Sequence, residues 1–230
     1  MRLLAGLFFV LFLAPAWADR IAIIGTGDVA GALGPRFAEL GHTVVYGSRE
    51  PAAERVKALV DATGHGASAD TQAGAAGAAD IIILAVPAGV VVSVAQSLGD
   101  LAGKILIDPT NSFRFTDQPL VEPTAETPIA VQLQEAVPDA HVVKAFNIVW
   151  YKVMIDPALA GGAMTIPLVG NDPGAKQKVA RLVRELGFES SDLGPIRYAR
   201  EVEGMLILWF NARLNGRPFN FYFRPEQRPG

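Results

Sequence analysis

Cysteine is absent from the 230 residues, which excludes disulfide cross-links, thiol nucleophiles and metals held by cysteine. Histidine occurs only three times, and no histidine has a carboxylate or a second histidine at the spacing of metal ligands. Long runs of one charge are also missing, because Lys and Arg are scattered through a chain with a formal net charge of −3. Nucleic-acid backbones require a basic face. The sequence therefore predicts no metal site and no nucleic-acid partner.

Only one segment, residues 1–18, has the pattern of a targeting signal. Arg2 precedes an apolar run, and Ala16-Trp17-Ala18 supplies the small residues of a cleavage site. The run is shorter than the ~20 residues that a membrane-spanning helix needs. We therefore predict a secretory signal peptide and export of the mature chain to the periplasm. The alternatives are an uncleaved anchor and a leader that does not function. A leader that does not function would leave the protein in the cytoplasm.

After the leader, short apolar runs alternate with stretches of helical periodicity, which is typical of a parallel sheet with crossover helices. The expected strands are 20–24, 43–47, 81–86, 105–107, 141–145 and 188–193, with one more around Leu168. The expected helices are 29–40, 51–62, 90–98, 129–137, 173–186 and 196–214. Residues 64–79 give weak signals, and 109–128 form a proline-rich loop of the length that often borders a site. These patterns predict one α/β domain over 19–194, followed by a helix and tail over 195–230.

A glycine-rich turn, Gly25-Thr26-Gly27-Asp28-Val29-Ala30, follows the first expected strand and opens the first helix. The first glycine permits the tight turn, and the second allows the backbone to approach a pyrophosphate. The small residue that ends the motif lets the helix and strand pack closely. Amide groups and the dipole at the helix start attract the anion. The position of the motif predicts a Rossmann-type doubly wound parallel sheet with a small C-terminal helical extension, and a dinucleotide as ligand.

The end of the second strand discriminates between the two nicotinamide dinucleotides. An acid at this position binds the ribose hydroxyls of NAD, whereas a hydroxyl and a guanidinium suit the 2′-phosphate of NADP. The chain has Ser48 and Arg49 here, and the nearest acid, Glu50, comes one residue late. The sequence therefore predicts NADP as the cofactor.

Several motifs together resemble the NADPH-dependent oxidoreductases of coenzyme F-420 and their bacterial relatives. The resemblance extends from Ile21 to about Trp209, and its motifs are residues 23–28, 47–49, 84–87, 108–111, 143–147, 170–172, 186–188 and 193–196. The block 143–147 and the block 193–196 are the more specific ones, since the glycine turns recur across Rossmann proteins. The family fold implies an NADP-binding Rossmann domain with a small C-terminal part, often paired as a dimer.

The resemblance also implies roles for individual residues. Gly25, Thr26, Gly27, Asp28 and Val29 would form the turn that holds the pyrophosphate, and Ser48 and Arg49 would bind the 2′-phosphate. Ala85, Val86 and Pro87 would lie along the nicotinamide ribose, with Ala145 and Asn147 close to the ring. One departure concerns a second phosphate-binding lysine of the relatives, which is Ala53 here, so that Arg55 or Lys57 would have to replace it.

Hydride transfer from a nicotinamide to a flavin-like ring requires orientation in a dry pocket rather than a side-chain acid or nucleophile. We therefore assign no catalytic residue and predict an NADP oxidoreductase whose small-molecule acceptor is a flavin or a deazaflavin such as coenzyme F-420. An imine or keto-acid reductase of the pyrroline-carboxylate reductase kind is the alternative, and it would need a proton donor such as Lys144 or Lys152. A non-catalytic NADP-binding module is a further alternative.

Two features remain open at this point. Asp108 ends an expected strand, where it either caps the following loop or faces the site. Met205 to Phe210 is an unbroken apolar block, more than one face of a helix can bury against a single sheet. A second subunit would cover the excess, so we predict a homodimer formed through the C-terminal helix.

Overall fold

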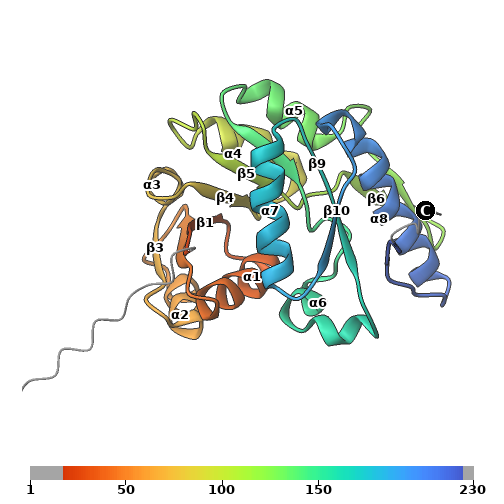
Figure 1. The fold of residues 1–230 in the computed structure, drawn as a ribbon, viewed down its shortest axis with the longest axis horizontal. Helices are drawn as coiled ribbons and strands as arrows, with labels where there is room; N and C mark the ends of the chain where they lie inside the picture. The colour runs from red at the N-terminus through yellow and green to blue at the C-terminus, as the bar shows by residue number, and fades with distance from the viewer. Residues whose placement is uncertain (1–17, 225–230) are drawn as a thin grey trace, which may run out of the picture.

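The structure, a computed structural model, describes residues 18–224, so the predicted leader lies outside the described residues except for Ala18. Its centre is an eight-stranded sheet in the order β10-β9-β8-β5-β4-β1-β2-β3 (Figure 1). The strands are β1 (Arg20–Ile24), β2 (Thr43–Ser48), β3 (Ser68–Thr71), β4 (Ile81–Leu84), β5 (Ile105–Asp108), β8 (His141–Lys144), β9 (Thr165–Gly170) and β10 (Glu189–Asp192). Within this sheet, only β8 and β9 pair antiparallel, and the other neighbouring strands are parallel. The Rossmann-type α/β fold is confirmed.

Helices cover both faces of this sheet. They are α1 (Asp28–Glu39), α2 (Glu54–Thr63), α3 (Gln72–Gly77), α4 (Ala88–Gln96), α5 (Ile129–Ala136), α6 (Tyr151–Ile155), α7 (Pro173–Glu185) and α8 (Ala199–Leu214), with 3-10 turns η1 (Pro157–Ala160) and η2 (Ile196–Tyr198). Ile21 and Ile23 pack in the core that includes α1 and α7, whereas Ala22 and Ile24 belong to the core on the opposite face. Since successive residues of a strand point to opposite faces, β1 is buried from both sides.

The strand order reverses between β1 and β4, because the chain runs β1-β2-β3 in one direction and then returns to place β4 on the other side of β1. In doubly wound sheets, ligands bind outside the carboxyl ends of the strands at this reversal. The turn after β1 and the residues after β4 therefore lie where the glycine motif predicts a dinucleotide.

Some expected boundaries are wrong by a few residues. Helix α2 begins at Glu54 rather than at Pro51, because Ala53 is in an extended conformation and serves as its N-cap. Strand β4 ends at Leu84, and the residues up to Pro87, which is the N-cap of α4, form the connection. Helix α1 continues through Pro35.

The expected loop 109–128 contains a short antiparallel hairpin, β6 (Phe113–Phe115) and β7 (Val121–Pro123). Helix α8 packs against this hairpin. Asn211 accepts a hydrogen bond from the backbone N–H of Val121 at 2.7 Å, and the rings of Phe113 and Phe210 lie 5.0 Å apart. The sequence signal failed here because three-residue strands between prolines show no measurable alternation.

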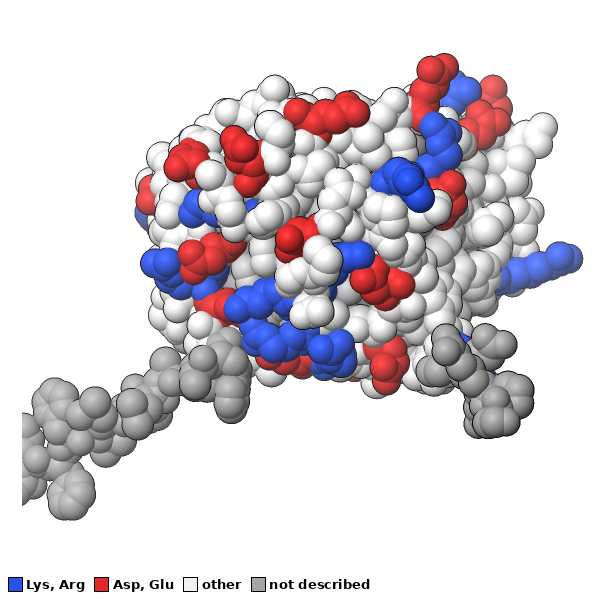
Figure 2. Space-filling model, turned by 45° about the horizontal axis from the view of Figure 1, so that its top comes forward, with Lys and Arg blue, Asp and Glu red and all other residues white. Residues whose placement is uncertain are grey.

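The apolar block in α8 is partly buried within its own chain. Leu206 and Trp209 are buried in the core, whereas Leu208 between them is 63% exposed. Helix α8 contacts the hairpin and the sheet and so packs as part of the same fold. The predicted domain boundary at residue 195 stays a prediction. The predicted homodimer also stays a prediction. Acidic and basic side chains are interspersed on the face seen in Figure 2. Among the described residues, no helix has the length and apolar character needed to cross a membrane.

Candidate dinucleotide site

A cleft of about 560 Å³ opens at the carboxyl ends of β1, β2 and β4. Most residues predicted to bind the cofactor line it: Gly25, Thr26, Gly27, Ser48, Arg49, Ala85, Val86 and Pro87. Asp28 and Val29 open α1 directly after this turn. The cleft also includes Gln72, Val90, Ser93 and Val94, which sequence reasoning missed. Gln72 begins α3 in the Gly/Ala-rich stretch, whose residue pattern is too weak to place any side chain.

Gly25 is required by the backbone. Its φ is +118°, and an added Cβ would lie 2.1 Å from the carbonyl oxygen of Ala85. Its N–H donates a hydrogen bond of 2.9 Å to the carbonyl of Gly47. The turn is therefore held between the ends of β2 and β4, and only glycine fits there.

Gly27 differs, because an added Cβ would meet no atom within 4 Å. It is the N-cap of α1 with φ −91° and ψ −163°, an extended conformation that any residue adopts. No side chain of the described chain caps this helix, so its first amide groups lack a side-chain acceptor. Open space beside an uncapped helix start suits a pyrophosphate, which takes hydrogen bonds from such amides and is attracted by the helix dipole.

The end of β2 offers donors for a 2′-phosphate. Ser48 is nearly buried, and its Oγ accepts a hydrogen bond from the N–H of Glu50 at 3.1 Å, which leaves the hydroxyl proton free for a ligand. Arg49 is exposed at the cleft. Arg55 lines the cleft and has Glu50 at 3.9 Å, whereas Lys57 does not line the cleft and forms a closer ion pair with Glu54 at 2.8 Å. Arg55 is therefore the better replacement for the lysine that position 53 lacks.

The predicted residues near the nicotinamide ring are placed differently. Ala145 and Asn147 are both buried and do not line the cleft. Asp108 caps its loop, because its Oδ1 accepts hydrogen bonds from the N–H and the hydroxyl of Thr110, at 2.9 and 2.7 Å. Its Oδ2 accepts a hydrogen bond from Lys144 Nζ at 2.8 Å. Burial would lower the pKa of Lys144, but the neighbouring carboxylates outweigh burial and raise its pKa, so it is protonated.

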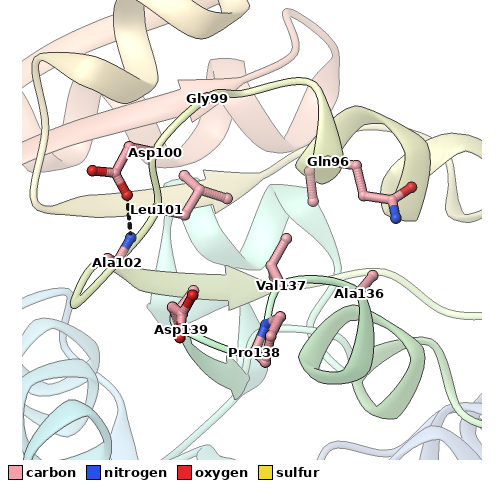
Figure 3. A pocket seen from close by; sticks show the side chains of 11 residues that line it. Gln96, Gly99, Asp100, Leu101, Ala102, Ala136, Val137, Pro138 and Asp139 are labelled. Carbon is pink, nitrogen blue, oxygen red and sulfur yellow. Dashed lines mark hydrogen bonds between the residues drawn. The ribbon is translucent and has the colours of Figure 1, made fainter.

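A second cavity, of about 270 Å³, lies where the ends of α4 and α5 approach the amino ends of β5 and β8 (Figure 3). Its charged side chains are Asp100 and Asp139, and Asp100 accepts a hydrogen bond from the N–H of Ala102. Two carboxylates would repel the phosphates of a dinucleotide. Within residues 18–224, no group of three or more His, Asp or Glu side chains could hold a metal ion.

Comparison with known proteins identifies the family. The sequence profile of the NADP oxidoreductases described as coenzyme F420-dependent matches residues 20–112. The crystal structure of a provisionally named F420-dependent NADP reductase from Arthrobacter sp. FB24 has a TM-score of 0.80 and 30% identity, and the match covers 90% of this chain and all of that one. The chain belongs to the F420-dependent NADP oxidoreductase family.

Two curated relatives extend the comparison. The F420-dependent NADP reductase of Methanothermobacter thermautotrophicus is 28% identical, over 90% of this chain and 97% of its own length. The human metalloreductase STEAP2 is 34% identical over 193 residues, which are 83% of this chain but only 36% of that protein. The chain thus spans about a third of the STEAP relative. The family is one of NADP-dependent oxidoreductases, and the roles of this chain's individual residues stay predictions.

Proposed function

We propose that the enzyme transfers a hydride between NADP(H) and a flavin or deazaflavin ring such as coenzyme F420. The observation that supports a ring acceptor is the state of the two candidate proton donors, Lys144 and Lys152. Asp108 and Lys144 are fully buried and paired with each other. Lys152 is exposed on the first turn of α6, with its ammonium 4.9 Å from the centre of the Trp150 ring. Reduction of an imine or a keto acid requires a placed donor, whereas hydride transfer between two rings does not.

In this proposal the protein's own residues bind the cofactor and orient it toward the acceptor ring. The Gly25–Gly27 turn and the start of α1 receive the pyrophosphate, and Ser48 with Arg49 and Arg55 receives the 2′-phosphate. Bound NADPH supplies the hydride, and solvent supplies the proton that the acceptor ring takes up with it. The protein lowers the barrier by holding the two rings in contact and excluding water from between them.

The acceptor is tested by mixing the enzyme anaerobically with NADPH and, in separate reactions, coenzyme F420, FMN, FAD, a cyclic imine and a keto acid. We expect NADPH oxidation with at least one ring acceptor and none with the imine or keto acid. Turnover of the imine or keto acid alone would favour the alternative reductase. Tight NADPH binding without turnover of any acceptor would favour the non-catalytic module.

The similarity to STEAP2 supports a second candidate, in which a flavin carries the electrons onward to a metal ion. One reduced flavin would reduce two Fe³⁺ chelates to Fe²⁺ and release its protons. We expect ferric reduction by the enzyme and NADPH only when FAD or FMN is added. Iron reduction with coenzyme F420 but without a flavin would contradict this candidate.

We also propose that the leader exports the chain and is cut after Ala18. The fold supports this position, because Asp19, the second of the described residues 18–224, has several anchoring contacts. Its N–H donates to His42 Nδ1 at 3.0 Å, its carbonyl accepts from Thr43 at 2.9 Å, and its carboxylate pairs with Lys178 at 2.6 Å. The intact mass of the protein isolated from a fractionated native host tests this. A periplasmic chain that begins at Asp19 is expected, and a cytoplasmic chain that retains Met1 would refute export.

A further inference from the structure

A buried polar network joins the ends of β5 and β8 to helix α8. The Lys144 side chain is completely buried, and its Nζ donates hydrogen bonds of 2.8 Å to Asp108 Oδ2 and to the carbonyl of Thr110. Glu203 of α8 places Oε1 3.0 Å from the same ammonium. One lysine therefore ties the two strand ends to the C-terminal helix.

The network continues into the residues that follow each strand. Asn111 donates to the carbonyl of Asn147 at 2.8 Å, and Asn147 Nδ2 donates to Asn111 Oδ1 at 2.9 Å and to the carbonyl of Val202 at 3.2 Å. Between Lys144 and Asn147 lies Phe146, a buried residue with φ +63°. This left-handed conformation is unfavourable for a side chain with a Cβ, so surrounding contacts must hold it.

Fold stability is a weak explanation for these charges. Well-packed apolar side chains often replace a buried ion pair with no loss of stability, because burial of the charges opposes their attraction. What an ionic network supplies instead is a fixed arrangement of its members. Here the members hold the loops after β5 and β8, at the edge of the sheet where the cofactor binds.

We propose that Lys144 is a positioning residue that acts, through the loop 145–147, on the nicotinamide half of the cofactor. The inference rests on the proposed function, in which this half lies beyond the cleft that receives the adenosine half. The amide oxygen of Asn147 supports it, because this buried atom has no hydrogen-bond partner among the described residues. Asn147 does not line the cleft, so the loop 145–147 would have to shift on binding for a carboxamide N–H of the nicotinamide to reach this oxygen.

The test compares two ligands by calorimetry in the absence of any acceptor. NADPH contains both halves of the cofactor, whereas 2′,5′-ADP contains only the adenosine half and the 2′-phosphate. In Lys144→Met, we expect NADPH to bind at least tenfold more weakly and 2′,5′-ADP to bind within twofold of the wild type. Equal changes for the two ligands, or no change for either, would overturn the positioning role.

The matched control is Lys176→Met. Lys176 is also nearly buried and pairs with Asp192 at 2.7 Å, but it joins α7 to β10 away from the cleft. General loosening of the fold would affect both lysine variants alike, so the control should keep the wild-type ratio of the two affinities. A control that loses NADPH selectively would refute the inference.

Lys144→Met leaves two carboxylates near each other, and that variant could fail to fold. All three charges are removed in the triple variant Lys144→Met, Asp108→Asn, Glu203→Gln. The ratio of its NADPH and 2′,5′-ADP affinities then tests the positioning role. A triple variant with the wild-type ratio would overturn the proposal. A different result would refute the proposed function: a wild type that binds NADPH but reduces no ring acceptor. The ratio of the NADPH and 2′,5′-ADP affinities would still test the role of Lys144.

Discussion

The variant Gly27→Val distinguishes the role of the turn after β1 in pyrophosphate binding from its role in the stability of the fold. The added Cβ meets no atom within 4 Å, and φ at this position is already in a region open to every residue. Substitutions that create no clash and no backbone strain change stability by less than about 1 kcal/mol. The melting temperature of Gly27→Val should therefore stay close to that of the wild type.

Binding should respond very differently. The branched side chain fills the space from which a pyrophosphate reaches the first amides of α1, and loss of two hydrogen bonds to a charged group costs about 3 kcal/mol at 1.5 kcal/mol each. That loss corresponds to a decrease in NADPH affinity of roughly 100-fold or more, measurable by calorimetry.

Gly25→Ala is the contrasting variant. Its Cβ would lie 2.1 Å from the backbone oxygen of Ala85 at a positive φ, so the fold itself should lose stability. Wild-type affinity of Gly27→Val for NADPH would show that the turn does not hold the cofactor. A Gly27→Val protein that unfolds would show that the space beside Gly27 serves the fold.

Three further outcomes are expected. Arg49→Ala should reduce the preference for NADPH over NADH about tenfold while leaving NADH affinity nearly unchanged, because a charge-assisted contact to the 2′-phosphate is lost; equal wild-type affinities would contradict the assignment. Leu208→Glu should convert a dimer to a monomer in light scattering without a change in melting, because Leu208 is 63% exposed in the single chain, and a monomeric wild type would refute the dimer. Burial alone would raise the pKa of Asp19, but the bonds of its carboxylate to Lys178 and Arg181 have the larger effect and hold this pKa below its usual range. The stability from this carboxylate is therefore present above the unfolded pKa and lost as pH falls through the folded pKa, so Asp19→Asn should flatten the acid limb of the unfolding curve.

The residues that line the candidate cleft could be predicted from the sequence because their signals are local. The turn after β1 and the end of β2 each combine a buried strand with the residues that directly follow it. Parallel strands place these short segments together at one edge of the sheet, so no long-range contact had to be guessed. Close packing was harder to foresee. An added Cβ on Gly34 would lie 1.9 Å from the hydroxyl of Tyr46, a contact between α1 and β2 that no sequence pattern marks.

The nicotinamide half could not be predicted in the same way. Lys144 looked like a candidate proton donor, and its burial depends on Glu203 from a helix much later in the chain. Asn147 is fixed by the carbonyl of Val202, 55 residues away. Such contacts follow from how α8 packs and leave no periodicity or spacing in the sequence. The hairpin under α8 was missed because its three-residue strands are too short to show an alternating pattern.

The cleft and the loops after β5 and β8 are held by different parts of the fold. The cradle for the pyrophosphate is built from strand ends and short turns, so it constrains the cofactor and leaves the acceptor undefined. The loops after β5 and β8 are instead held by α8, whose own position depends on the hairpin through Asn211 and Val121. A change in α8 or the hairpin would therefore shift the loop that carries Asn147 without disturbing the cleft. The shared glycine motif therefore does not report how the loop that carries Asn147 is held.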